Sequence, residues 1–237
     1  MKNLSESEIV PIDPSQSSLI TDQVPGATFH TKEYFRHGPD QMFLVRLLKG
    51  IIPISDILCI EGDAGKEKYL SYEMPLNNIS TNGALKPLAQ AELDVLILDY
   101  VFNDCDHATP VSDQSEVERS NIMIGKQAHA FFDFEIFANF WSYKGVNKEY
   151  LLRDFTKFSK VQAIFLASRL DNLIERFSGV AGVDFIKSVA ESVEKTTGDK
   201  ITVIEKALPV AGGKTVAFQS ELLNRLKKMK AFLDFVL

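Results

Sequence analysis

One stretch of sixteen residues, Pro87–Phe102 (PLAQAELDVLILDYVF), limits what this chain can fold into. Its apolar residues leave almost no polar face, and the stretch is too long for an ordinary strand. It therefore predicts a buried helix, which requires a sizeable core around it. The chain has 237 residues, 45% hydrophobic and 24% charged, which is typical of one large or two small globular domains and not of a disordered chain.

The charge balance and the cysteines exclude several classes of function. Lys and Arg number 26 against 32 Asp and Glu, so the net charge of −6 argues against broad binding to nucleic acid. Cys59, Cys105 and four scattered histidines form no CxxC pair, so the sequence supports neither a disulfide framework nor a thiolate zinc site. The first residues lack the apolar core of a secretion signal, and no apolar run approaches the length of a membrane-spanning helix, so we expect neither. We therefore expect a cytoplasmic protein without a transmembrane segment.

The pattern of the chain changes near residue 76. Residues 1–76 predict a small antiparallel sheet with one helix, which begins at Gly38-Pro39-Asp40 and ends at Gly50. Residues 77–237 predict mainly helices, at 87–102 and at roughly 161–177, 182–197 and 217–236. Between the first two of these helices, SNIMI and AHAFFDFE flank Gly125-Lys126-Gln127 and predict a β-hairpin.

The most informative segment connects the buried helix to this hairpin (NDCDH…NIMI…FFDFE). An antiparallel hairpin brings the start of its first strand beside the end of its second, so Asn121 and Asp133 are expected to be neighbours. Asp133 stands among phenylalanines, where a carboxylate needs a partner or a metal. Phosphoryl transfer from ATP needs a carboxylate that orients the acceptor hydroxyl and hard oxygen ligands for Mg²⁺. The segment therefore predicts Asp106 or Asp104 as the catalytic carboxylate and Asn121 and Asp133 as metal ligands.

These residues resemble the catalytic core of the atypical kinases, a group that includes phosphatidylinositol 3- and 4-kinases and HipA-like toxin kinases. The resemblance implies an α+β, bilobal protein-kinase-like fold, with a reduced N-lobe at 1–76 and a mainly helical C-lobe at 77–237. It implies that ATP lies between the lobes, with Lys32 at its phosphates and Glu73 and Met74 in the hinge at its adenine. The implied activity is Mg²⁺-ATP-dependent phosphotransfer to a lipid head group or to a protein hydroxyl.

Several positions depart from the family pattern. Asp106 and Asn121 are fifteen positions apart, whereas the kinase catalytic loop spaces its Asp and Asn by about five. Gln41 stands where a Glu partner for Lys32 is expected, and Glu135 stands where the family has a Gly. These departures favour an alternative, a catalytically inactive pseudokinase that acts as a partner-binding module. A helical adaptor without a nucleotide site is a third hypothesis.

Two basic segments suggest other ligands. AGGKT, at residues 211–215, ends like a phosphate-binding Walker A loop, but that motif requires a Gly where this chain has Leu208. RLKKMK, at residues 225–230, could touch an anionic membrane peripherally. A solvated helix face is the favoured interpretation of this segment.

Overall fold

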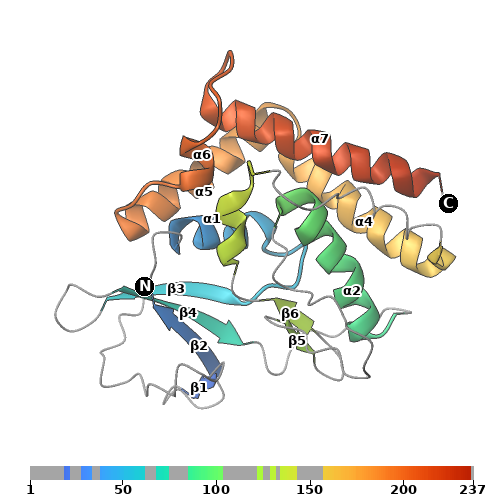
Figure 1. The fold of residues 1–237 in the computed structure, drawn as a ribbon, viewed down its shortest axis with the longest axis horizontal. Coiled ribbons are helices and arrows are strands. Elements are labelled where there is room, and N and C mark those ends of the chain that lie inside the picture. Colours follow the sequence, from blue (N-terminus) through green and yellow to red (C-terminus); the bar gives the residue numbers. More distant parts are fainter. Residues whose placement is uncertain are drawn as a thin grey trace.

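The computed structural model describes residues 19–21, 28–33, 38–61, 68–74, 85–103, 122–124, 129–131, 134–142 and 157–235. This part of the chain is mainly helical (Figure 1). Its helical elements are α1 (Gly38–Leu48), α2 (Pro87–Ile97), the π-helix η2 (Leu98–Phe102), the 3-10 helix η3 (Glu135–Asn139), α4 (Lys160–Phe177), α5 (Gly179–Thr197), α6 (Thr202–Glu205) and α7 (Lys214–Asp234). The four long helices predicted after residue 76 are confirmed.

Within the described residues, six short strands accompany the helices. They are β1 (Leu19–Thr21), β2 (Thr28–Glu33), β3 (Asp56–Glu61), β4 (Lys68–Met74), β5 (Ile122–Ile124) and β6 (His129–Phe131). The first four pair antiparallel in the order β1-β2-β4-β3, and β5 pairs antiparallel with β6. In the β2–β4 register Lys32 is opposite Leu70, while Glu73 and Met74 are opposite Phe29 and Thr28.

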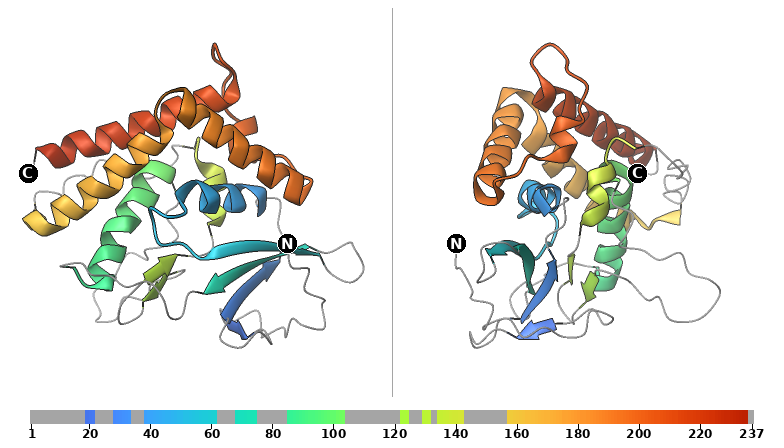
Figure 2. Two further views of the ribbon diagram at one scale, coloured as in Figure 1. Left: turned by 180° about the vertical axis from the view of Figure 1, so that it is seen from behind. Right: turned by 60° about the vertical axis from the view of Figure 1, so that its left-hand side comes forward.

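Helix α1 lies inside the helical body. Ten of its eleven residues are buried, and Arg46 alone is half-exposed. A helix that is apolar nearly all round must be covered on every side. Figures 1 and 2 show α1 between the strands and α5, and its Phe43 ring contacts the rings of Phe137 and Phe218 with centroids 6.5 and 5.7 Å apart. The helix expected in an N-lobe thus shares one core with the C-terminal helices.

The expected α+β, bilobal protein-kinase-like fold is therefore wrong. The described residues are mainly helical, and nothing in them forms a separate N-lobe built around α1. The physical reason is the composition of α1: MFLVRLL provides almost no polar face to turn toward a solvent-filled cleft between two lobes. Polar contacts fix the same arrangement, because Arg46 Nη1 donates to Ser192 Oγ of α5 at 2.8 Å and Arg176 Nη1 of α4 donates to the Leu47 carbonyl at 3.0 Å.

The three long C-terminal helices are amphipathic and pack on one another, and α5 also packs on α1. Helix α4 begins with a capping box, in which Ser159 Oγ accepts from the Gln162 N–H and the Gln162 side chain accepts from the Ser159 N–H. Its buried residues recur at helical spacing (Ala163, Leu166, Leu170, Leu173 and Phe177). Helices α4 and α7 lie side by side in both views, with α5 folded back from the end of α4 (Figures 1 and 2). Helix α7 packs against η2, whereas the β5–β6 hairpin packs against α2.

Candidate functional site

The four residues predicted to carry the chemistry, Asp104, Asp106, Asn121 and Asp133, lie outside the described residues. Lys32, Glu73 and Met74 lie in described strands, but the structure describes only their backbone. Their nucleotide-binding roles came with the bilobal arrangement and stay predictions. What the structure provides is the framework on either side of the predicted residues.

The predicted hairpin is present, and its register is defined. Ile122 is opposite Phe131 and Ile124 is opposite His129. Asn121 therefore directly precedes one strand in sequence, and Asp133 follows the other by two residues. On its other side β6 pairs with the chain before β3, because the Phe131 N–H donates to the Pro53 carbonyl and the Ser55 N–H donates to the Phe131 carbonyl, both at 3.0 Å. Strand β6 is thus paired on both edges, with β5 on one side and with residues 53–55 on the other.

The predicted buried helix changes its geometry just before the acidic segment. It is α-helical over Pro87–Ile97 and then π-helical over Leu98–Phe102. Asn103 ends it in the left-handed conformation, with φ 60° and ψ 32°. Among the described residues Asn103 alone combines a side chain with positive φ. π-Helical turns and left-handed non-glycine residues are both enriched at functional sites, and here they stand directly before Asp104.

A buried ion cluster joins α2, β6 and α4. The Asp94 carboxylate of α2 is completely buried; its Oδ2 lies 3.0 Å from His129 Nε2, and its Oδ1 accepts from Arg169 Nε at 3.2 Å. The same guanidinium donates through Nη1 to the Ile51 carbonyl. Because a carboxylate oxygen only accepts, His129 donates its Nε2–H to Asp94, and the other ring nitrogen is Nδ1. That Nδ1 is buried and has no hydrogen-bond partner within the described residues.

The sequence analysis did not predict this cluster. The cluster nevertheless holds β6 in place at His129, two residues before Phe131. The available signal was Asp94 itself, an acidic residue in an otherwise apolar helix, because a buried carboxylate must find a partner. The partners could not be read from the pattern. His129 and Arg169 are 35 and 75 positions away, and Arg169 sits in a helix most of whose other polar residues are exposed.

A second buried carboxylate, Asp40, holds α1 against α6. Its Oδ1 accepts from the Val203 N–H at 2.8 Å, which satisfies a backbone donor at the start of α6. Burial raises the pKa of Asp40 above its ordinary value, and the hydrogen bond from Val203 only partly opposes this. Asp40 is therefore a structural residue with an energetic cost at neutral pH, and it ties the N-terminal half of the chain to the C-terminal helices.

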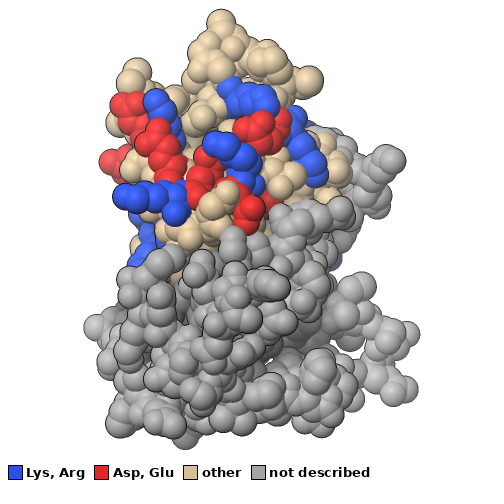
Figure 3. Space-filling view, turned by 90° about the vertical axis from the view of Figure 1, so that its left-hand side faces the viewer, with Lys and Arg blue, Asp and Glu red and all other residues tan. Residues whose placement is uncertain are grey.

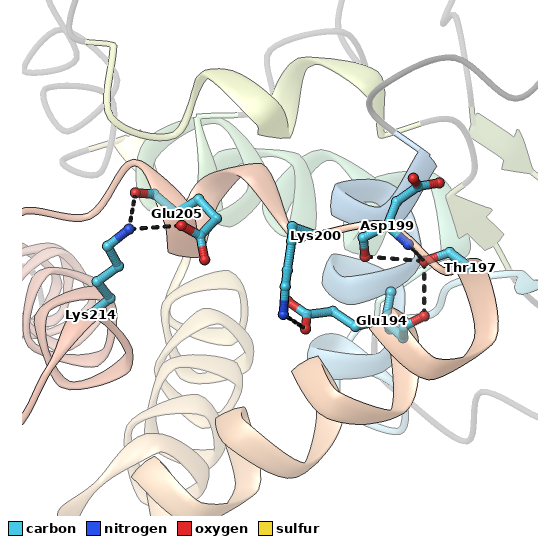
Figure 4. Close-up of polar contacts among 7 residues, drawn as sticks. Glu194, Thr197, Asp199, Lys200, Glu205 and Lys214 are labelled. Atoms are coloured by element: carbon cyan, nitrogen blue, oxygen red, sulfur yellow. Dashed lines mark hydrogen bonds and ion pairs between the residues drawn. The ribbon is translucent and has the colours of Figure 1, made fainter.

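The basic side chains of both segments make contacts within the folded chain. In AGGKT, Lys214 Nζ donates to the Glu205 carbonyl and to Glu205 Oε2, both at 2.8 Å, and this pairing lowers the pKa of Glu205 (Figure 4). In RLKKMK, Arg225, Leu226 and Met229 are buried and Lys230 pairs with Asp171 of α4. Figure 3 shows Lys and Arg interleaved with Asp and Glu on one face of the helical body. Lys227 and Lys228 are exposed, so the segment is only partly a solvated helix face, and its contact with a membrane stays a prediction.

Two further observations concern metals and membranes. Within the described residues no three His, Cys, Asp or Glu side chains come together as a metal site would require. None of the helices in the described part of the chain is long and apolar enough to cross a membrane. No protein-family model matches the chain, and no curated protein matches it significantly.

Proposed function

We propose that this chain binds Mg²⁺-ATP and transfers the γ-phosphoryl group to a hydroxyl of a lipid head group or a protein, in the cytoplasm. The observation that carries the proposal is the register of the β5–β6 hairpin. Its pairing of Ile122 with Phe131 supports the expectation that Asn121, which directly precedes Ile122, and Asp133, which follows Phe131 by two residues, are close in space.

The framework around the hairpin supports the same location. Helix α2 packs against both β5 and β6, and its continuation η2 ends two residues before Asp104. The acidic segment and both hairpin strands are thus connected to one packed unit. This support does not depend on a bilobal fold, because it uses only elements of the helical body and its hairpin.

The predicted residues provide the donor set that the reaction needs. The carboxylate of Asp133 and the amide oxygen of Asn121 are hard oxygen ligands of the kind that hold Mg²⁺, which neutralises charge on the phosphates when bound. The acceptor oxygen attacks the γ-phosphorus while the bond to the β-phosphate oxygen breaks and ADP leaves. Asp106, or alternatively Asp104, orients that hydroxyl and accepts its proton.

Isothermal titration calorimetry with ATP, in the presence and absence of Mg²⁺, tests the proposal. We expect binding that requires Mg²⁺ in the wild type and is lost in Asp133→Asn, because the substitution removes the charged ligand with little change in shape. Asp106→Ala should keep binding and lose transfer, since its role is confined to the transition state. Asp234→Asn, an exposed carboxylate of α7, is the matched control and should bind as the wild type does. Wild-type protein that does not bind ATP at any Mg²⁺ concentration contradicts the proposal.

A second candidate is the non-catalytic partner-binding module, and a protruding loop favours it. Between α6 and α7, Leu208 is 81% and Val210 49% exposed. The loop has a defined shape, because the Gly213 N–H donates to the Val210 carbonyl at 2.8 Å and Lys214 joins its base to Glu205. A preorganised apolar tip loses little entropy when it binds a partner. Recovery of a protein from source-cell lysate by the wild type, but not by Leu208→Asp, in the absence of ATP binding would favour this candidate.

A further inference from the structure

The loop between α6 and α7 presents an uncharged surface to solvent. Its six residues, 208–213 (LPVAGG), are all exposed, and none of them is charged. Figure 1 shows this loop rising above the helices, and the projection at the top of Figure 3 is tan, without Lys, Arg, Asp or Glu. Contiguous apolar residues that stand clear of the core of their own chain are typical of a contact with a partner or a membrane.

Hydrogen bonds hold this loop at both of its ends. Before it, Val203 of α6 accepts at its carbonyl from Trp141 Nε1 at 2.6 Å, and its N–H donates to a carboxylate of α1 at 2.8 Å. At its end the Gly213 N–H donates to the Val210 carbonyl at 2.8 Å. Gly212, the third residue of that turn, has φ 102°, a conformation that favours glycine. A loop held in this way loses little conformational freedom when it enters apolar surroundings.

Two lysines bracket the loop in the sequence, Lys206 before it and Lys214 after it. Lys214 pairs with Glu205 at 2.8 Å (Figure 4). Lys206 is exposed, and its Nζ donates to the Ala138 carbonyl at 3.4 Å, a neutral acceptor that leaves the ammonium charge in place. The base of the loop therefore carries a cationic charge beyond this ion pair, which is complementary to an anionic phosphate.

The composition of the tip discriminates between two kinds of partner. Trp, Tyr and Arg dominate binding to protein pockets, whereas Leu and Val are under-represented there. The tip provides Leu208 and Val210 and none of those three residue types. An uncharged, protruding tip can enter the boundary between lipid head groups and acyl chains without removing a charge from water. A flanking Lys suits the same partner, because its long side chain reaches the head groups from that boundary.

We propose that residues 208–213 are a lipid-docking loop, which inserts Leu208 and Val210 into a bilayer surface and places Lys206 at the head-group phosphates. This inference rests on the partner-binding candidate, whose partner it identifies as a lipid surface, and not on phosphotransfer. Two aliphatic side chains bury less apolar surface than a myristoyl chain, which by itself gives marginal, reversible membrane binding. We therefore expect weak, reversible docking that depends on each aliphatic side chain of the tip.

Co-sedimentation with vesicles of phosphatidylcholine and phosphatidylserine measures this docking. We expect the wild type to bind, and Leu208→Asp to bind at least about tenfold more weakly, because an inserting aliphatic side chain becomes a charged one. Lys206→Gln should weaken binding by about fivefold, since it removes one charge from the lipid surface. The matched control is Phe235→Asp: Phe235 is 96% exposed and follows the far end of α7, about 30 Å from the loop. This variant should bind as the wild type does.

Leu208→Trp tests insertion directly through fluorescence. The wild type has one tryptophan, Trp141, which is half-buried and bonded to Val203. Vesicles should leave its emission unchanged. The indole introduced at position 208 should instead shift its emission to the blue when vesicles are added, because indole rings settle at the boundary of the bilayer.

The variants separate the loop from other causes of vesicle binding, once thermal unfolding has shown that each is folded. Wild-type protein that binds no vesicles overturns the inference. If that protein nevertheless recovers a protein from lysate and Leu208→Asp does not, the partner-binding candidate stands with a protein as its partner. Equal vesicle binding by the wild type and Leu208→Asp also overturns the inference, because the contact then lies elsewhere, for example at RLKKMK. An equal loss in Phe235→Asp overturns it as well, since the added negative charge alone would explain the effect.

Discussion

Replacing Asp94 by Asn should destabilise the protein more than any substitution of an exposed carboxylate. Asp94 is fully buried, and its carboxylate accepts from Arg169 at 3.2 Å and from His129 at 3.0 Å. Breaking a buried ion pair on one side costs about 3–5 kcal/mol, because the remaining charge stays buried without its partner. The Arg169 side chain is 21% exposed and can still reach water. We therefore expect the lower end, about 3 kcal/mol, which corresponds to a Tm lowered by about 6–12 °C in a chain of this size.

Urea unfolding followed by circular dichroism measures this loss, and thermal unfolding gives the change in Tm. The control is Asp171→Asn, at an exposed position of α4. Its partner Lys230 is partly exposed too, so the loss of unfolding free energy should stay below about 1 kcal/mol. A double-mutant cycle with Arg169→Met isolates the pairwise term. The reasoning is refuted if Asp94→Asn changes stability by less than about 0.5 kcal/mol, or if the effects of the two substitutions simply add.

Three further substitutions test the packing of the helical body. Gly182→Ala should lower the free energy of unfolding in urea by a net of about 2 kcal/mol. A Cβ at this position would lie 2.2 Å from the Phe177 carbonyl oxygen, and a backbone atom cannot rotate away as a side chain can. The control, Ser188→Ala at an exposed position of the same helix, should change this free energy by less than about 0.5 kcal/mol. Asp40→Asn keeps the acceptor for the Val203 N–H and removes the ionisation. Since burial raises the folded-state pKa of Asp40 above 3.8, the wild type loses stability as pH rises from 3.8 through that pKa, and the variant should lack this decline; parallel pH profiles of unfolding free energy would contradict it. Leu208→Ser, at an 81% exposed position, should leave Tm unchanged, and a clear fall would show that the loop packs against the body.

Much of the local structure was predictable from sequence alone. The helices after residue 157 follow from apolar residues recurring at three and four, and the hairpin follows from a short Gly-containing connection between two apolar runs. The stretch Pro87–Phe102 was predicted as one buried helix, but its last turn is π-helical. Hydrophobic periodicity does not report this change, because α- and π-turns bury the same apolar residues over so short a length.

Only the tertiary structure decided what α1 packs against and which contacts hold η2 in place. An almost wholly apolar helix such as GPDQMFLVRLL has no polar face that orients it, so its sequence requires burial without specifying the partner. The resemblance assigned it to a separate lobe, whereas it lies in the core of the C-terminal helices. The polar contacts at η2 have the same origin. Arg225 and Val101 are 124 positions apart, and Asn103 and Asn139 are 36 apart. Sequence shows that such side chains need acceptors, but the acceptors are backbone carbonyls, which every residue provides, so their choice depends on the packing of the whole chain.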